Sequence, residues 1–220
     1  MKFKKNISFS IAVDGSSASG KTTGSKIIAK KFGFKFLSSG KLYRYLALRI
    51  IKNKGKYNYR FINKVSKNIT LKKLNSKQLY NPKITELSSI IAKNKYVRAS
   101  LRKFQLDFIK KNKKVLIEGR DAGSKILPSA DLKLFFKCSY KEKARRRFKE
   151  FKKINNKITL QQVKKALKKR DFMDKNRKES PLLFVKGAIK VDTTKINKLM
   201  LEDKLNKLVK KAINNKYGNL

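Results

Sequence analysis

A glycine-containing loop between an apolar strand and a helix constrains the fold of this chain more than any other feature. Residues 11–23 read IAVDGSSASGKTT, so an apolar run leads into the pattern G-x-x-x-x-G-K-T from Gly15 to Thr22. Glycines in such a loop let backbone N–H groups converge on phosphate oxygens, and the helix that follows adds its positive N-terminal end. This order of strand, loop and helix predicts a phosphate-binding site. The alternative is a Gly/Ser turn that only resembles one.

The glycine loop, as we call residues 15–22, supplies the first candidate site residues. Lys21 is expected to reach the β- and γ-phosphates of a bound nucleotide, and Thr22 to supply a hydroxyl ligand to Mg²⁺. The residues expected to bind the nucleotide in this segment are Gly15, Ser16, Ser17, Ala18, Ser19, Gly20, Lys21, Thr22 and Thr23. The motif predicts nucleotide binding, but it does not specify a reaction.

Short apolar strands alternate with helices along the rest of the chain. We expect strands at 7–13, 34–37, 115–119, 132–138 and 188–192, and helices at 22–32, 40–54, 85–111, 141–152, 159–175 and 197–214. This alternation is typical of an α/β fold, in which helices cover both faces of a parallel sheet. Residues 55–83 follow no regular pattern. We expect them to form a small insertion over a cleft, with a strand at 68–74.

The positive charge of the chain does not by itself indicate a nucleic-acid-binding protein. The 220 residues contain 60 Lys and Arg against 14 Asp and Glu, for a net charge of +46, but the lysines are spread along the whole length. A nucleic-acid-binding face requires clustered charge. A general bias toward lysine therefore explains the composition better, and we expect no specific nucleic-acid partner. The alternative is a basic nucleic-acid-binding protein with weak ATPase activity.

Composition also limits the compartment and the chemistry. No stretch approaches the roughly 18 to 20 apolar residues that span a bilayer. Lysines precede an apolar run at the N-terminus, but we do not expect a cleaved leader, because cleavage there would remove the strand before the glycine loop. The single Cys138 forms no internal disulfide, and histidine is absent, which excludes a Cys/His zinc site. We expect a cytoplasmic monomer without a membrane partner.

Arginine is scarce beside lysine, so its positions are informative. Eight of the 11 arginines lie in segments that other motifs single out: Arg44, Arg98, Arg120, Arg145, Arg146, Arg147, Arg170 and Arg177. A guanidinium suits bidentate recognition of a phosphate or a base edge. Ordinary ion pairing is the alternative, although only 14 acidic residues are available as partners.

Five further segments carry distinctive motifs: SSGKLYR (38–44), SSIIAKNKYVRASLRKFQ (88–105), EGRDAGSKILPSADLKLFF (118–136), RDFMDKNRKESPL (170–182) and AIKVDTT (188–194). In this order they resemble the bacterial cytidylate kinase family. The resemblance implies a P-loop NMP-kinase-like fold with a parallel five-stranded sheet flanked by helices. It implies a single kinase domain over 1–220 with a core at 1–54 and 84–220, an NMP-binding insertion at 55–83 and a helical lid at 141–175.

The resemblance also implies the reaction, the phosphorylation of CMP and dCMP by ATP with Mg²⁺. It makes Lys21, Arg44 and Arg120 the catalytic residues, with Arg44 and Arg120 on the CMP phosphate. Cytosine would be recognised by Ser39, Arg98, Asp121 and Arg177. The pentose would be contacted by Ser89, Arg170 and Asp174. Among Arg145, Arg146 and Arg147 we assign Arg146 to ATP, while the sequence leaves open which of the three contacts the triphosphate.

The spacing within RDFMDKNR supports this site independently of the resemblance. Arg170, Asp174 and Arg177 are separated by four and three residues, which puts them on one helix face. The alternative is a surface ladder of ion pairs.

Some positions depart from the family. Ser38 stands where the family usually has Asp, and Glu118 where some members carry Asp. A UMP, dTMP or shikimate kinase on the same scaffold is the competing enzyme, but the GRD and RDxxDxxR segments argue against it.

Overall fold

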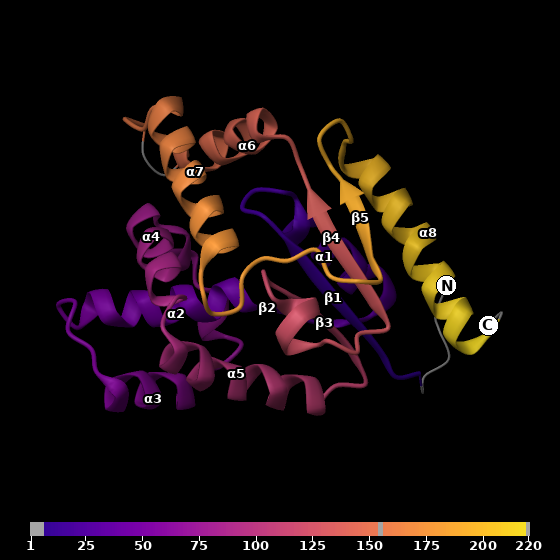
Figure 1. Cartoon of the computed structure of the whole chain (residues 1–220), viewed down its shortest axis with the longest axis horizontal. Coiled ribbons are helices and arrows are strands. Elements are labelled where there is room, and N and C mark those ends of the chain that lie inside the picture. The colour runs from indigo at the N-terminus through magenta and orange to yellow at the C-terminus, as the bar shows by residue number, and fades with distance from the viewer. Residues whose placement is uncertain (1–6, 154–155, 219–220) are drawn as a thin grey trace.

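Five parallel strands form the centre of the computed structural model, which describes residues 7–153 and 156–218 (Figure 1). The strands are β1 (Phe9–Gly15), β2 (Lys35–Ser38), β3 (Lys114–Glu118), β4 (Leu132–Lys137) and β5 (Ala188–Asp192), in the order β2-β3-β1-β4-β5. All four neighbouring pairs are parallel. The predicted α/β class and the five-stranded parallel sheet are therefore confirmed.

Helices cover both faces of the sheet because alternate strand residues point to opposite sides. Ile11 and Val13 pack toward α1 (Lys21–Phe32) and α8 (Lys198–Tyr217), whereas Ala12 between them packs on the other face. The helices on that second face are α2 (Ser39–Lys52), α3 (Tyr59–Lys67), α4 (Pro82–Ile91) and α5 (Lys95–Lys110). The result is a three-layer arrangement with one apolar cluster on each side of the sheet.

Two further helices, α6 (Tyr140–Lys152) and α7 (Leu160–Asn176), lie beyond the carboxyl ends of the strands. Figure 1 shows the arrowhead of β4 pointing up toward α6, with α7 beside it above α4. Thr159 starts α7 with a capping box in which its side chain and that of Gln162 bond reciprocally to backbone N–H groups. These two helices therefore face the edge of the sheet at which ligands bind in open α/β folds.

The strand predicted at 68–74 is wrong. The insertion consists of α3 followed by short 3₁₀ turns at Lys73–Asn75 and Lys77–Tyr80. Ile69, Leu74 and Leu79 are buried in the helical cluster with α2, while Leu71 is 49% exposed. A strand over this segment would need alternate residues on one face, and the apolar residues do not follow that period.

The single helix predicted at 85–111 is also wrong, because the structure divides it into α4 and α5. The break falls at Ala92–Asn94, where the side chain of Asn94 accepts hydrogen bonds from the N–H groups of Tyr96 and Val97. An asparagine in this position caps a new helix instead of continuing the old one. Arg98 donates to the carbonyl oxygen of Ala92 across the break, at 3.1 Å.

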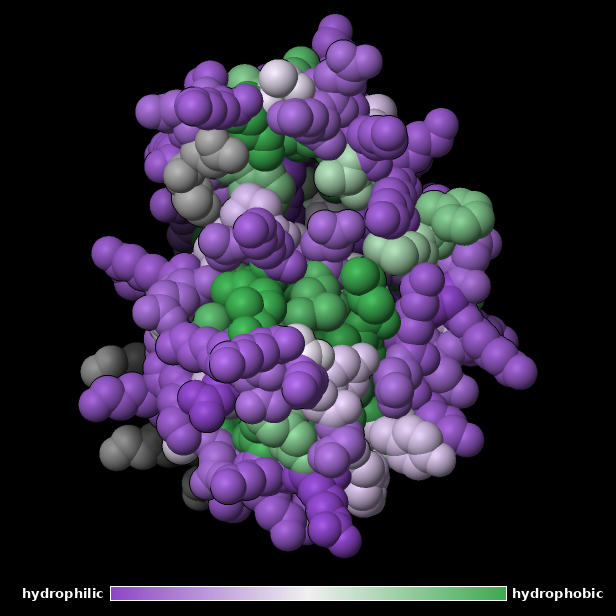
Figure 2. All heavy atoms as spheres, turned by 90° about the vertical axis from the view of Figure 1, so that its left-hand side faces the viewer, coloured by the Kyte–Doolittle hydropathy of each residue, from purple (hydrophilic) through white to green (hydrophobic). Residues whose placement is uncertain are grey.

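Hydrophilic side chains cover most of the face shown in Figure 2, and the largest group of apolar side chains on it lies near its centre. Within residues 7–153 and 156–218, no helix is long and apolar enough to cross a membrane.

Candidate active site

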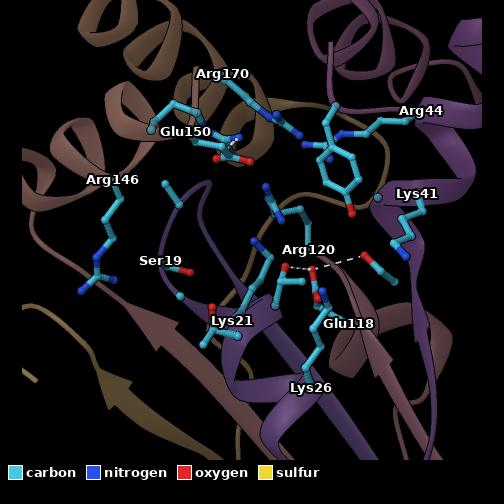
Figure 3. A pocket seen from close by; sticks show the side chains of 18 residues that line it. Ser19, Lys21, Lys26, Lys41, Arg44, Glu118, Arg120, Arg146, Glu150 and Arg170 are labelled. Carbon is cyan, nitrogen blue, oxygen red and sulfur yellow. Dashed lines mark hydrogen bonds and ion pairs between the residues drawn. The ribbon is translucent and has the colours of Figure 1, made fainter. Parts of the chain in front are cut away.

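A cavity of about 400 Å³ lies where the glycine loop, α2, the end of β3, α6 and α7 meet (Figure 3). Lys21 and Arg120 point into its middle, Glu118 lies below them, and Arg44 and Arg170 extend toward each other above (Figure 3). Its other walls are Ala18, Ser19, Gly20, Thr22, Thr23, Lys26, Ser38, Gly40, Lys41, Tyr80, Arg146, Arg147 and Glu150. The cavity therefore joins the predicted nucleotide loop to the predicted arginines.

The glycine loop adopts a conformation that two of its glycines make possible. Gly15 has a φ of 153°, and a Cβ there would lie 2.5 Å from the carbonyl oxygen of Phe136. Gly20 has a φ of 82° immediately before α1. Between them, Ala18 also has a positive φ, 57°. That left-handed conformation costs a non-glycine residue about 1 kcal/mol, so the loop needs outside support.

Buried positive charge is concentrated around the cavity. Burial, with Arg120 next, holds the pKa of Lys21 well below its usual value, and its Nζ donates to the carbonyl oxygen of Ser16 at 3.0 Å. Burial and Arg120 likewise lower the pKa of Arg170. For Arg44, burial and then Arg147 lower the pKa to about 10. The cavity thus carries more cationic charge than its carboxylates neutralise.

Several of these guanidinium nitrogens have no protein partner. Within the part of the chain that the structure describes, Nε and one terminal nitrogen of Arg170 and Nε of Arg44 are buried without a hydrogen bond. Arg44 lies over the ring of Tyr80, 5.2 Å from its centroid. Buried donors without acceptors are costly, so the cavity suits a ligand with many anionic oxygens, such as a polyphosphate.

Glu118 supplies a carboxylate beside the glycine loop. Its Oε1 accepts hydrogen bonds from Thr22 Oγ1 at 3.0 Å and from Ser38 Oγ at 3.4 Å. Its Oε2 is buried and has no partner among the described residues. Hard oxygen ligands of this kind suit Mg²⁺. Ser38 replaces the Asp that is usual in the family, but the loop still has a carboxylate beside it. Glu118 supplies it from the position paired with Ser38 across β2 and β3.

A second, smaller cavity of about 50 Å³ adjoins the first. Gly40, Arg120 and Arg170 line both. Eight of the nine residues predicted to bind the substrate line the smaller cavity: Ser39, Ser89, Arg98, Arg120, Asp121, Arg170, Asp174 and Arg177. The ninth, Arg44, lines the larger one. Residues from α2, α4, α5, α7 and the end of β3 thus meet as the sequence predicts.

Ion pairs organise the smaller cavity. Arg98 pairs with Asp121, and both are buried. Asp174 lies between two guanidiniums, with 2.7 Å from its Oδ2 to Arg120 Nε and 3.5 Å from its Oδ1 to a terminal nitrogen of Arg177. Burial opposes ionisation of Asp174, but Arg120, Arg170 and Arg177 lower its pKa overall. Asp174 therefore stays ionised and holds Arg120 and Arg177 in place.

Comparison with known proteins agrees with this geometry. The family model for cytidylate kinase matches residues 11–213. The cytidylate kinase of Fusobacterium nucleatum is 38% identical over 212 residues, which cover 91% of this chain and 95% of that protein. The cytidylate kinase of Mycoplasmoides gallisepticum is 36% identical over 219 residues, 94% of this chain and 96% of that protein. The chain belongs to the cytidylate kinase family.

The sequence-based family assignment is therefore confirmed. A third cytidylate kinase, from Caldanaerobacter subterraneus, is 32% identical over 217 residues, 94% of this chain and 96% of that protein. Among solved structures, an uncharacterized protein from Eubacterium ventriosum superimposes with a TM-score of 0.53 at 14% identity, covering 94% of this chain and 98% of that one. At that identity the likeness concerns the fold alone.

Some predicted nucleotide-site residues do not line the cavity. Gly15, Ser16 and Ser17, the first residues of the glycine loop, are not among its lining residues. Ser16 and Ser17 bond to α6 and α7 through Lys143 and Asp171. Arg146 lines the cavity, but it already donates to Thr193 and Glu142.

Several residues of this site were given no role in the sequence analysis. Tyr43 lines the smaller cavity, and Arg98 lies over its ring, 5.6 Å from the centroid. Gln105, almost fully buried, donates from Nε2 to Ser39 Oγ at 2.7 Å. Gln105 and Asp171 lie inside the segments that carried the resemblance, so their positions were visible. Their roles were not, because they act through residues distant in sequence.

Asp14, at the end of β1, connects the glycine loop to the segment that carries Arg120 and Asp121. Its two carboxylate oxygens accept from the N–H groups of Ala122 and Gly123 at 2.8 and 2.7 Å. Burial raises the pKa of Asp14 to about 6, although these two hydrogen bonds lower it. Asp14 is therefore protonated more readily in the folded chain than in the unfolded chain.

This raised pKa predicts an unusual pH dependence of stability. Because the folded state binds the proton more tightly, the contribution of Asp14 to the free energy of unfolding falls as pH rises from about 4 to about 6, by about 3 kcal/mol. Denaturant unfolding of wild type and Asp14→Asn across this range should give a difference with that slope. Asp131→Asn should give a difference of the opposite sign, and at lower pH, below about 4: despite partial burial, Lys216 and Ser10 lower the pKa of Asp131, so its stabilising contribution is lost as pH falls. A difference for Asp14→Asn that does not vary with pH would contradict the prediction.

Proposed function

We propose that this protein is an ATP-dependent kinase that transfers a phosphoryl group to CMP and dCMP. The observation that carries the proposal is the pair of adjoining cavities that share Arg120 and Arg170. The larger cavity offers the glycine loop to a triphosphate, and the smaller one offers carboxylates and guanidiniums to a nucleoside. An acceptor phosphate at the shared wall would face the γ-phosphate of ATP.

The proposed mechanism consists of positioning and charge neutralisation. The phosphoryl group in transfer would lie among Lys21, Arg120 and Arg170. Arg44 also lines this cavity. Their buried charges would stabilise the transition state without reorganisation. The acceptor is itself an anionic phosphate oxygen, so the reaction needs no protein nucleophile. Movement of the proposed lid, residues 141–175, would exclude water.

Cytosine recognition is proposed for the deep end of the smaller cavity. The Asp121 carboxylate would accept from the exocyclic amine that uracil lacks, while Arg98 and Arg177 would donate to acceptor atoms of the ring, and Ser39 would contact the same base. Ser89, Arg170 and Asp174 would meet the pentose.

Mg²⁺ is proposed to bind with ATP beside Thr22 and Glu118. Within the described residues, no group of three or more acidic, Cys or His side chains could hold a metal by itself. The nucleotide would therefore supply most of its ligands. Thr22 would give a hydroxyl oxygen, and Glu118 a carboxylate that contacts the ion directly or through water.

Glu118→Gln is expected to raise the Mg²⁺ concentration needed for half-maximal activity by about tenfold, because a neutral amide attracts the ion less. The Michaelis constant for CMP at saturating Mg²⁺ should change much less. A titration of activity with MgCl₂ checks this. An unchanged Mg²⁺ requirement would remove Glu118 from the metal site.

The function is tested by following ADP release from ATP–Mg²⁺ with CMP, dCMP, UMP, dTMP, AMP and shikimate in turn. Turnover with CMP and dCMP alone supports the proposal. Turnover with another acceptor keeps a kinase and overturns the cytosine assignment. No turnover with any acceptor, together with tight salt-dependent binding to RNA, would favour the nucleic-acid-binding alternative.

The monomeric state, the cytoplasmic location and the division into core, insertion and lid stay predictions.

A further inference from the structure

The strained residue of the glycine loop is held from both sides by segments outside the loop. Ala18 has a φ of 57° and lines the large cavity. A non-glycine residue keeps such a conformation only where its surroundings enforce it. The residues on either side of Ala18 show which contacts do so.

On the N-terminal side, α6 and α7 hold Ser16 and Ser17. The carboxylate of Asp171, in α7, accepts from the backbone N–H of Ser17 at 3.3 Å and pairs through its other oxygen with Lys143, in α6. Lys143 Nζ also donates to Ser16 Oγ at 3.3 Å, and Arg147 donates to Ser17 Oγ at 2.8 Å. Lys143 is only 7% exposed. Its charge is therefore buried beside the partly buried carboxylate of Asp171.

On the C-terminal side, the residue that follows β5 holds Ser19. Thr193 Oγ1 donates to the carbonyl oxygen of Ser19 at 2.9 Å. Thr193 is in turn held by Arg146, which donates to its carbonyl oxygen at 2.6 Å. Ala18 is thus fixed between two supports, and α6 contributes to both.

We propose that Asp171, together with Lys143, is a positioning residue that keeps Ala18 in its left-handed conformation and so preserves the ATP-binding shape of the glycine loop. The affinity for ATP then depends on where α6 and α7 lie. This inference rests on the proposed function only in placing ATP at the glycine loop. Asp171 lines neither cavity and acts on ATP only through its contact with the backbone of the loop at Ser17.

A double-mutant cycle tests the proposal, because glycine adopts a positive φ without outside support. Asp171→Asn keeps the shape of the side chain but removes its charge, and we expect it to weaken ATP–Mg²⁺ binding by about tenfold. In the A18G background the same change should weaken binding by about threefold or less. Isothermal titration calorimetry measures each dissociation constant without requiring turnover.

The Michaelis constant for CMP separates positioning of the loop from general damage. It should change less than about twofold in Asp171→Asn, since the smaller cavity is not lined by Asp171. Asp171→Ala repeats the cycle should Asp171→Asn fold poorly. Asp203→Asn, which removes an exposed acid paired with Lys207, is the matched control and should leave ATP binding unchanged.

Equal losses of ATP affinity in the two backgrounds would overturn the proposal, because Asp171 would then act independently of Ala18. Unchanged ATP affinity in Asp171→Asn would overturn it as well. If the cycle shows coupling but CMP is not phosphorylated, the inference stands and the proposed acceptor fails. The two conclusions are therefore tested separately.

Discussion

Replacing Lys21 with methionine is expected to lower kcat for CMP phosphorylation by about 10²- to 10³-fold, the usual effect of removing one donor to a developing charge. Lys21 is 6% exposed and lies in the middle of the large cavity, next to Arg120. Among the contacts that the structure describes, its Nζ donates only to the carbonyl oxygen of Ser16. A triphosphate would give this buried charge its counter-charge.

The same substitution should not weaken the ligand-free fold. Burial and Arg120 already lower the pKa of Lys21, so a neutral side chain of similar length removes an electrostatic cost. We expect the melting temperature without nucleotide to stay equal or rise, while the increase on adding ATP–Mg²⁺ is lost. Lys207→Met, at a 77% exposed side chain, is the matched control. A Lys21→Met enzyme with wild-type kcat would contradict the assignment of Lys21 as catalytic.

Replacing Asp121 with asparagine is expected to reduce the ratio of kcat/KM for CMP to kcat/KM for UMP by about 100-fold or more. A carboxylate accepts from the amine of cytosine but repels the carbonyl oxygen that uracil carries there. An asparagine amide can donate to that oxygen, so the penalty against UMP falls while CMP loses a charge-assisted hydrogen bond.

A ratio is the right measurement because Asp121→Asn also breaks a buried pair. Arg98 would lose its charged partner, and removing one member of such a pair costs about 3 to 5 kcal/mol of stability. The two substrates share the same folded fraction, so that loss cancels in the ratio. Asp203→Asn should keep the wild-type ratio. An unchanged ratio in Asp121→Asn, with activity still measurable, would mean that other groups read the base.

Local patterns predicted the strands and the glycine loop well. The strand before the loop, the G-x-x-x-x-G-K-T spacing and the helix after it involve neighbouring residues only, so sterics and hydrogen bonding along the chain specify them. The i, i+4, i+7 spacing of Arg170, Asp174 and Arg177 likewise placed all three against one cavity. The roles of these residues with ATP and CMP remain proposals.

Local patterns failed in the region between α2 and α5. Residues 68–74 do not form the predicted strand: Ile69 and Leu74 are buried in the helical cluster with α2, and Leu71 is 49% exposed. The helical period continues through 92–94, but the side chain of Asn94 accepts the first N–H groups of a new helix. In both places tertiary packing and capping outweighed periodicity.

Sequence patterns were enough to specify the α/β class, the position of the glycine loop and the family of this protein, because each depends on residues close together or on an ordered set of motifs. Which charged side chains lie together depends on the folded arrangement. Asp174 lies against Arg120, 54 positions away, Gln105 against Ser39, 66 away, and Asp171 against Ser17, 154 away. Such pairs form because packing brings helices from both ends of the chain to one edge of the sheet, and no local spacing rule encodes that geometry.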